Sequence, residues 1–130
     1  MNENERQIRQ VVGAYAADPT IIVFGSLAAG AARFDSDLDV AVDIGALLGS
    51  EDRLDLVMAL GSALGRPVDL VDLQTVGEPL LGQILRHGRR LQGSDEQYAS
   101  LIRRHIFEST DFLPYRDRIL QARRLAWIGK

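Results

Sequence analysis

The sequence contains no cysteine among its 130 residues. This absence excludes a disulfide framework, a thiolate metal site and a cysteine nucleophile, and it suits a reducing compartment. The chain also lacks an apolar run near the ~20 residues that a membrane-spanning helix needs. Its first residues are polar and acidic, unlike a signal peptide. We therefore expect a cytoplasmic protein that has no membrane partner.

Two common phosphate-binding motifs are missing as well. The segment from Gly25 to Gly30 has the glycine spacing of a P-loop, but Ala31 and Ala32 stand where lysine and serine or threonine are required. The glycine pattern of dinucleotide-binding folds is also absent. The sequence thus excludes both of these phosphate-binding classes.

The chain has little excess charge of either sign. A formal net charge of -3 argues against the usual basic nucleic-acid-binding protein, so we expect no direct contact with nucleic acid. That sum conceals a split, because residues 1–80 carry a net charge of -8 and residues 81–130 a net charge of +5. The arginine-rich second part is most simply a solvated cationic face, and the alternative is a surface that docks an acidic partner.

The length and the 46% hydrophobic content predict one domain with a substantial core. No repeat or linker interrupts the chain. We expect a single domain over residues 1–130, with a core of about 1–93 and a C-terminal helical part of about 94–130.

Hydrophobic periodicity in the first half predicts alternating helices and strands. A helix contains Ile8 and Tyr15 on one face and ends near Asp18. The run at residues 20–24 is typical of a strand buried on both faces, and a brief helix is expected over residues 26–32. Residues 37–43 alternate acidic or small with apolar, which predicts a strand with one functional face.

The second half continues this order. Ser50 is expected to cap a helix that ends at Gly65, with Leu54, Val57, Met58 and Leu64 on its apolar face. The remaining predicted elements are a strand at 68–73, a helix at 78–87, a short edge strand at 89–92, and helices from 95 with a break at Pro114. This order predicts an α/β (α+β) domain in which helices flank a small mixed sheet, followed by C-terminal helices.

The residues that indicate chemistry lie at the end of the first strand and at the start of the second. Gly25 and Ser26 end a buried strand at the start of a short helix, where backbone N–H groups and the helix dipole favour a phosphate. Asp37 and Asp39 lie two apart on the next strand, so their carboxylates share one face. Two such carboxylates repel each other unless a cation lies between them, and their oxygens suit Mg²⁺. The pattern predicts a phosphoryl or nucleotidyl transfer site.

A third carboxylate would complete the metal shell and could accept a proton from an attacking hydroxyl. Asp69 and Asp72 are the candidates, and because they are three apart on a strand only one can face the site. We favour Asp69, which has apolar neighbours near the strand start, and interpret Asp72 as a surface or strand-end residue.

The pattern Gly25-Ser26-x10-Asp37-x-Asp39, followed by Asp69 in Gly-Arg-Pro-Val-Asp-Leu-Val, resembles the minimal nucleotidyltransferases of the DNA polymerase β-type superfamily. The resemblance runs over most of the chain. The arginine-rich end, with Asp111-Phe112-Leu113-Pro114 before it, is similar to MntA-type antitoxins of MNT/HEPN (MntA–HepT) toxin–antitoxin pairs. The resemblance implies the nucleotidyltransferase fold.

The resemblance also implies an activity and roles for residues. An antitoxin of this family is a protein adenylyltransferase that uses ATP and Mg²⁺, two ions, to place AMP on a tyrosine of a cognate HEPN-domain ribonuclease toxin, with which it forms a hetero-oligomer. By this resemblance Gly25 and Ser26 bind the triphosphate. Asp37 and Asp39 bind the metals, and Asp69 is the third ligand and the base.

One position departs from the family pattern. Ala29 stands where an arginine is common, so either Arg33 or a C-terminal arginine supplies positive charge to the phosphates, or the activity is weaker.

Two alternative functions stay open. The first alternative is a nucleotidyltransferase that acts on a small hydroxylated molecule such as an antibiotic. The second is a binding-only antitoxin that blocks the toxin sterically.

Three further residues give only weak signals of function. His87 and His105 have no partner at metal-ligand spacing, so we expect both to be structural or surface residues. Trp127 and its apolar neighbours are either core residues or a partner-binding patch.

Overall fold

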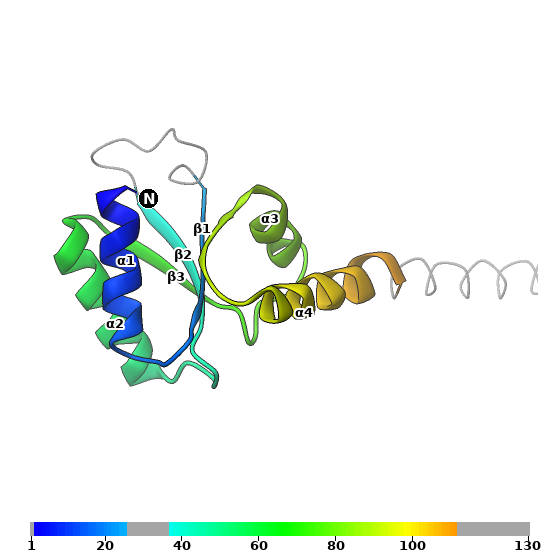
Figure 1. Cartoon of the computed structure of the whole chain (residues 1–130), viewed down its shortest axis with the longest axis horizontal. Helices are drawn as coiled ribbons and strands as arrows, with labels where there is room; N and C mark the ends of the chain where they lie inside the picture. Colours follow the sequence, from blue (N-terminus) through cyan, green and yellow to red (C-terminus); the bar gives the residue numbers. More distant parts are fainter. Residues whose placement is uncertain (1, 26–36, 112–130) are drawn as a thin grey trace, which may run out of the picture.

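Helices and strands alternate along the chain in the computed structural model, which describes residues 2–25 and 37–111 (Figure 1). The elements are α1 (Glu3–Gly13), β1 (Thr20–Phe24), β2 (Leu38–Asp43), α2 (Ser50–Leu64), β3 (Val68–Asp72), α3 (Leu80–His87), β4 (Arg89–Gln92), α4 (Asp95–Ile106) and a π-helical turn (Phe107–Asp111). The predicted α/β class is confirmed. The expected helix over residues 26–32, the break at Pro114 and the surroundings of Trp127 lie outside the described residues.

The strands form one mixed sheet in the order β3-β2-β1-β4. β1 runs antiparallel to both of its neighbours, whereas β2 and β3 are parallel. Parallel neighbours need a crossover connection, and α2 supplies it. The sheet confirms the predicted mixed topology, including the short edge strand at residues 89–92.

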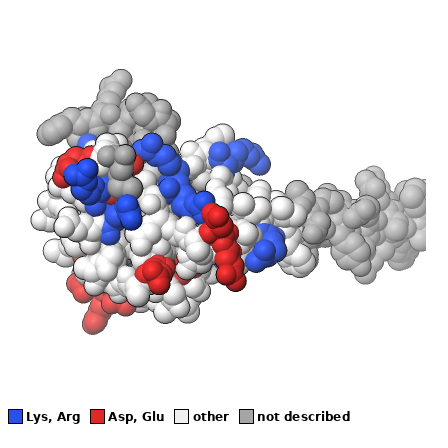
Figure 2. Space-filling model, in the orientation of Figure 1, with Lys and Arg blue, Asp and Glu red and all other residues white. Residues whose placement is uncertain are grey.

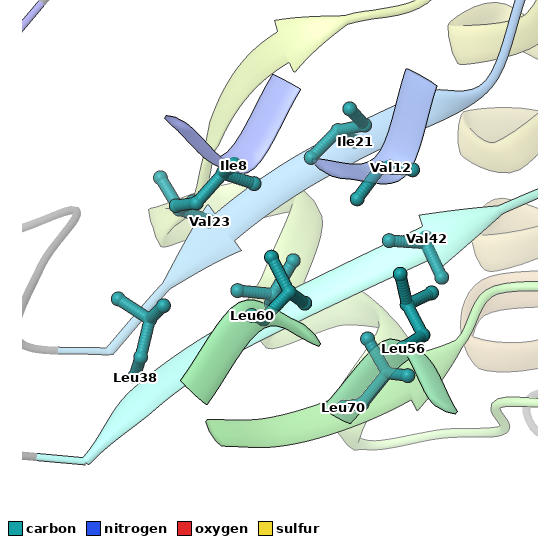
Figure 3. Packing of buried hydrophobic residues seen from close by; sticks show 10 residues of the cluster. Ile8, Val12, Ile21, Val23, Leu38, Val42, Leu56, Leu60 and Leu70 are labelled. Carbon is teal, nitrogen blue, oxygen red and sulfur yellow. The ribbon is translucent and has the colours of Figure 1, made fainter. Parts of the chain in front are cut away.

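Helices cover both faces of the sheet, with α1 and α2 on one face and α3 and α4 on the other (Figure 1). Alternate residues of β1 supply the two cores, because successive side chains of a strand point to opposite faces. Ile21 and Val23 pack with α1 and α2, as Figure 3 shows, while Ile22 packs with residues of α3 and α4. Helices on both sides thus explain why residues 20–23 of this strand are buried, with Phe24 partly buried at its end.

The first helix is shorter than its pattern predicts. It begins at a cap in which the Asn2 side chain accepts the Glu5 N–H, and it ends at Gly13 and not near Asp18. Gly13 is a poor helix former, and the residue before a proline avoids the helical region. Asp18, which precedes Pro19, has a φ of 52°, in the left-handed region and outside any helix, in the turn that leads into β1.

The second helix has the predicted bounds but a different cap, and only part of its predicted apolar face is buried. Gly49 is its N-cap and makes no side-chain cap hydrogen bond, so the predicted capping role of Ser50 is wrong. The fully buried residues are Leu56 and Leu60, and the expected Val57 and Leu64 pack against the same core. Leu54 is instead 58% exposed and Met58 63% exposed. The helix carries apolar residues on two faces, and the packing of α1 and the sheet selects one of them.

Smaller differences occur at three other element ends. β2 starts at Leu38, so Asp37 precedes the strand in which it was expected. β3 stops at Asp72, one residue early, and α3 starts at Leu80 where a helix from residue 78 was expected. No helix within the described ranges is long and apolar enough to cross a membrane.

Candidate functional site

Asp39 lies at the centre of the candidate site, on the middle of three adjacent strands. Its register partner on β1 is Phe24, and its partner on β3 is Asp69. Register partners on neighbouring strands project to the same face. Ala41 follows Asp39 by two positions and packs in the core with α3, so the Asp39 and Asp69 carboxylates belong to the α3 face of the sheet.

Asp37 directly precedes β2 and is exposed, two positions before Asp39. The electrostatics place the three carboxylates near one another. Partial burial raises the pKa of Asp39, and the negative charges of Asp69 and Asp37 raise it further. In residues 2–25 and 37–111 no cationic side chain forms an ion pair with any of the three. The described part of the site is therefore an anionic cluster whose mutual repulsion a bound cation would offset.

The donor chemistry of this cluster suits a divalent metal ion. Carboxylate oxygens are the hard ligands that Mg²⁺ prefers. Within the described ranges, however, no three carboxylate or imidazole groups already lie close enough together to hold a metal ion. The cluster thus fits Mg²⁺ in ligand type and charge, and its members would have to converge further on an ion.

Gly25 is required by its contact with Asp39. Its φ is +69°, a conformation that side chains rarely adopt, and a Cβ atom there would lie 2.2 Å from Asp39 Oδ2. The sequence analysis assigned Gly25 to the approach of a phosphate, and the contact with Asp39 gives a second reason that only the three-dimensional structure reveals. Ser26 and Arg33, the other predicted phosphate-binding residues, lie outside the described residues.

Asp72 has a structural role. It is 5% exposed, its Oδ2 accepts the Leu48 N–H at 2.9 Å, and its Oδ1 accepts the Gln74 N–H at 2.9 Å. Both oxygens are occupied by loop backbone, which favours Asp69 as the third carboxylate of the site. The interpretation of Asp72 as a strand-end residue is confirmed, but it is buried and not on the surface.

Sequence reasoning missed a second cluster of polar contacts, at the start of α3. The His105 Nδ1 forms a very short contact with Glu78 Oε1, and Glu78 Oε2 accepts the Gly82 N–H at 2.9 Å. Burial alone would raise the pKa of Glu78, but these hydrogen bonds, with the nearby charge of Arg104, lower it. His105 therefore fastens α4 to the start of α3. Their separation of 27 residues left no local signal of the pair.

Two arginines of the basic half pair with side chains of other elements of the fold. Arg89 pairs with the buried Glu5 of α1, and Arg90 pairs with Asp95 while its guanidinium lies 4.5 Å from the centre of the Tyr98 ring. Basic and acidic side chains are interspersed on the face drawn in Figure 2. The described part of the chain thus uses these arginines to join elements of the fold.

The comparisons with known proteins agree with this geometry. Residues 6–97 match the family described as "Polymerase beta, Nucleotidyltransferase". The chain is 37% identical over 76 residues to the protein adenylyltransferase MntA of Shewanella oneidensis. That alignment covers 58% of this chain and 55% of the relative, so it spans about half of the relative's length.

Two solved structures resemble the whole chain. A toxin–antitoxin complex with AMP-PNP superposes with a TM-score of 0.74 at 30% identity, covering 97% of this chain and 96% of the matched chain. The tri-AMPylated Shewanella oneidensis HEPN toxin in complex with its MNT antitoxin gives a TM-score of 0.67 at 28% identity, covering 97% and 93%.

Proposed function

Because the chain belongs to the polymerase beta nucleotidyltransferase family, we propose that it is an antitoxin that transfers AMP from ATP to a tyrosine of a HEPN-domain toxin. The observation that supports this proposal most directly is the juxtaposition of Asp39 and Asp69 on adjacent strands, with Asp37 beside them and no structural partner for the group in the described ranges. The similarity to MntA and to the complexes that hold AMP-PNP or an AMPylated toxin supports ATP as donor and a HEPN toxin as acceptor.

The three carboxylates divide two roles in the proposed reaction, metal binding and proton acceptance. Asp37 and Asp39 would hold Mg²⁺, with Asp69 as a further ligand. Bound Mg²⁺ would neutralise phosphate charge and stabilise the attacking and leaving oxygens. Asp69, at the β3 side of the cluster, is suited to accept the proton of the attacking tyrosine hydroxyl. The new bond joins the tyrosine oxygen to the α-phosphorus, the bond from that phosphorus to the bridging oxygen breaks, and pyrophosphate leaves.

The phosphates would lie at the end of β1. Gly25 leaves the space beside Asp39 free of a side chain. Ser26 and Arg33, which follow it, are the proposed ligands of the triphosphate. The triphosphate and the metal-binding carboxylates would therefore meet where β1 ends and β2 begins.

We further propose a cytoplasmic hetero-oligomer with the toxin. We retain the division into a core of about 1–93 and a helical part from about 94, which the family match ending at residue 97 supports.

The experiment measures AMP transfer to the proposed partner, a HEPN-domain toxin to be sought in the gene adjacent to that of this chain. Wild-type protein incubated with ATP, Mg²⁺ and that toxin should add the mass of an adenylyl group to it, measured by intact-mass spectrometry. The Asp37→Asn/Asp39→Asn variant should add none. Asp52→Asn/Asp55→Asn, the same change at two exposed positions of α2, is the matched control and should keep full transfer.

The two alternatives predict different results in this assay. No mass change of a folded toxin with wild-type protein contradicts the proposal. Toxin neutralisation that survives Asp37→Asn/Asp39→Asn supports a binding-only antitoxin. Modification of a small hydroxylated molecule without any toxin supports the antibiotic-type enzyme.

A further inference from the structure

A small hollow lies between the end of β1 and the exposed side of α3. It has a volume of about 270 Å³ and is lined by Phe24, Gly25, Leu80, Gln83 and His87. Phe24 and Leu80 supply an apolar lining, while Gln83 and His87 are exposed on α3 and carry hydrogen-bonding groups. The hollow thus combines apolar walls with a polar rim, as small-molecule sites do.

The hollow adjoins the carboxylate cluster on the same face of the sheet. Phe24 is the register partner of Asp39, so the two side chains project to one face. Gly25 lines the hollow and also borders the Asp39 carboxylate. The strand order places Asp69 on the opposite side of Asp39. A ligand that reaches both the hollow and the carboxylates would therefore extend across the end of β1.

We propose that this hollow binds the nucleobase of the nucleoside triphosphate, with Gln83 and His87 contacting the edge of the base and determining base selectivity. The proposal rests on the proposed function. Pockets that enclose a whole drug-sized ligand measure about 300–1,000 Å³. The hollow, at about 270 Å³, suits one ring system and not an entire nucleotide. The apolar side chains would contact the faces of the base, and the amide and imidazole would bond its edge.

The other aromatic ring in the reaction, that of the acceptor tyrosine, fits this hollow less well. Its hydroxyl must reach the proton acceptor Asp69, which lies across Asp39 from the hollow. An in-line attack also brings the acceptor to the side of the phosphorus opposite the leaving pyrophosphate. The hollow borders Gly25, on the side assigned to the triphosphate, and so belongs to the donor nucleotide.

The test compares two ligands in the full-length protein by calorimetry with Mg²⁺ present: ATP, and inorganic tripolyphosphate, which has no base. Gln83→Trp places a large ring at the rim of the hollow, and we expect it to weaken ATP binding about 10–100-fold, the range that loss of one stacked base gives. Tripolyphosphate binding should be unchanged. Arg86→Trp is the matched control, because Arg86 is exposed on the same helix but does not line the hollow. The Arg86→Trp variant should keep the wild-type ratio of ATP affinity to tripolyphosphate affinity.

A second pair of variants tests the selectivity. His87→Ala and Gln83→Leu should reduce the preference for ATP over CTP, GTP and UTP, while both keep the wild-type affinity for tripolyphosphate. If Gln83→Trp leaves ATP affinity unchanged, or lowers both affinities equally, or if the preference among bases survives both substitutions, the hollow is not the base site. A wild-type protein that binds neither ligand would instead contradict the proposed function, so the two failures differ.

Discussion

The contact between Gly25 and Asp39 makes a quantitative prediction for Gly25→Ala. Two separate costs arise at this position. A left-handed backbone costs a residue with a Cβ about 1–2 kcal/mol, and the φ of Gly25 is +69°. The new methyl group would also lie 2.2 Å from Asp39 Oδ2, so the carboxylate must move.

These two costs should appear in different measurements. The backbone term lowers the free energy of unfolding by about 1–2 kcal/mol, which for a domain of this size lowers the melting temperature by about 3–10 °C. The displacement of Asp39 acts on the reaction, since misplacing a catalytic group by about 1 Å can reduce the rate about 100-fold. We therefore expect a modest loss of stability together with a loss of AMP transfer of about 100-fold.

Gly65 offers a matched control within the same chain. It ends α2 with a φ of +69°, the value of Gly25, but a Cβ there would have no neighbour within 4 Å. Gly65→Ala should thus show the same loss of stability in urea unfolding and thermal melting, with transfer by the folded protein unchanged. Equal transfer by the two variants would refute the reasoning, because the contact with Asp39 would then have no consequence. A Gly25→Ala variant with wild-type stability would refute the claim that the left-handed backbone at this position costs free energy.

Three further predictions concern individual carboxylates. Asp72→Ala removes a buried acceptor from the backbone N–H groups of Leu48 and Gln74, so urea unfolding should show a loss of about 2–4 kcal/mol, with AMP transfer by the folded fraction retained. Asp39→Asn removes a carboxylate whose pKa is raised by burial and by two neighbouring carboxylates. Without divalent ions the substitution should therefore raise the free energy of unfolding, by less than about 1 kcal/mol in this partly exposed site. With Mg²⁺ and ATP present it should abolish AMP transfer. The fold lowers the pKa of Glu78, so its contribution to stability is complete above its ordinary pKa of 4.5 and is lost as the pH falls through the folded-state value. Acid unfolding of Glu78→Gln should consequently lack this part of the pH dependence, and an unchanged profile would contradict the assignment.

Local sequence patterns were sufficient where a residue's environment follows from its own neighbours. The strand at 20–24 was predicted with its observed bounds because a run of β-branched and aromatic residues has few other structures available. The position of Asp39 on the second strand was also predicted from the pattern, whereas Asp37 precedes that strand, so its shared face with Asp39 stays a prediction. The preference for Asp69 over Asp72 also came from strand geometry, and the hydrogen bonds of Asp72 support it.

The features that were missed depend on contacts between distant parts of the chain. The apolar residues of α2 indicate a helix, but only the position of α1 and the sheet decides that Leu56 is buried and Leu54 exposed. Nothing near His105 in the sequence indicates Glu78 as its partner. Likewise, the requirement for glycine at position 25 depends on Asp39, which is fourteen residues away and on another strand. A single sequence does not specify such pairs.

The contrast between Asp39 and Asp72, on neighbouring strands, bears on whether the carboxylate cluster has a function. A buried carboxylate that serves the fold is expected to accept hydrogen bonds that offset its desolvation. Asp72 meets this expectation with two backbone N–H groups. Asp39 is instead partly buried beside two other carboxylates, its pKa is raised, and no basic side chain in the described ranges pairs with it. The repulsion among these carboxylates lowers the stability of the fold. A bound cation would offset that repulsion and make the site attractive to an anionic ligand. Opposite effects of Asp39→Asn and Asp72→Ala on stability and on AMP transfer would therefore separate a site kept for chemistry from one kept for structure.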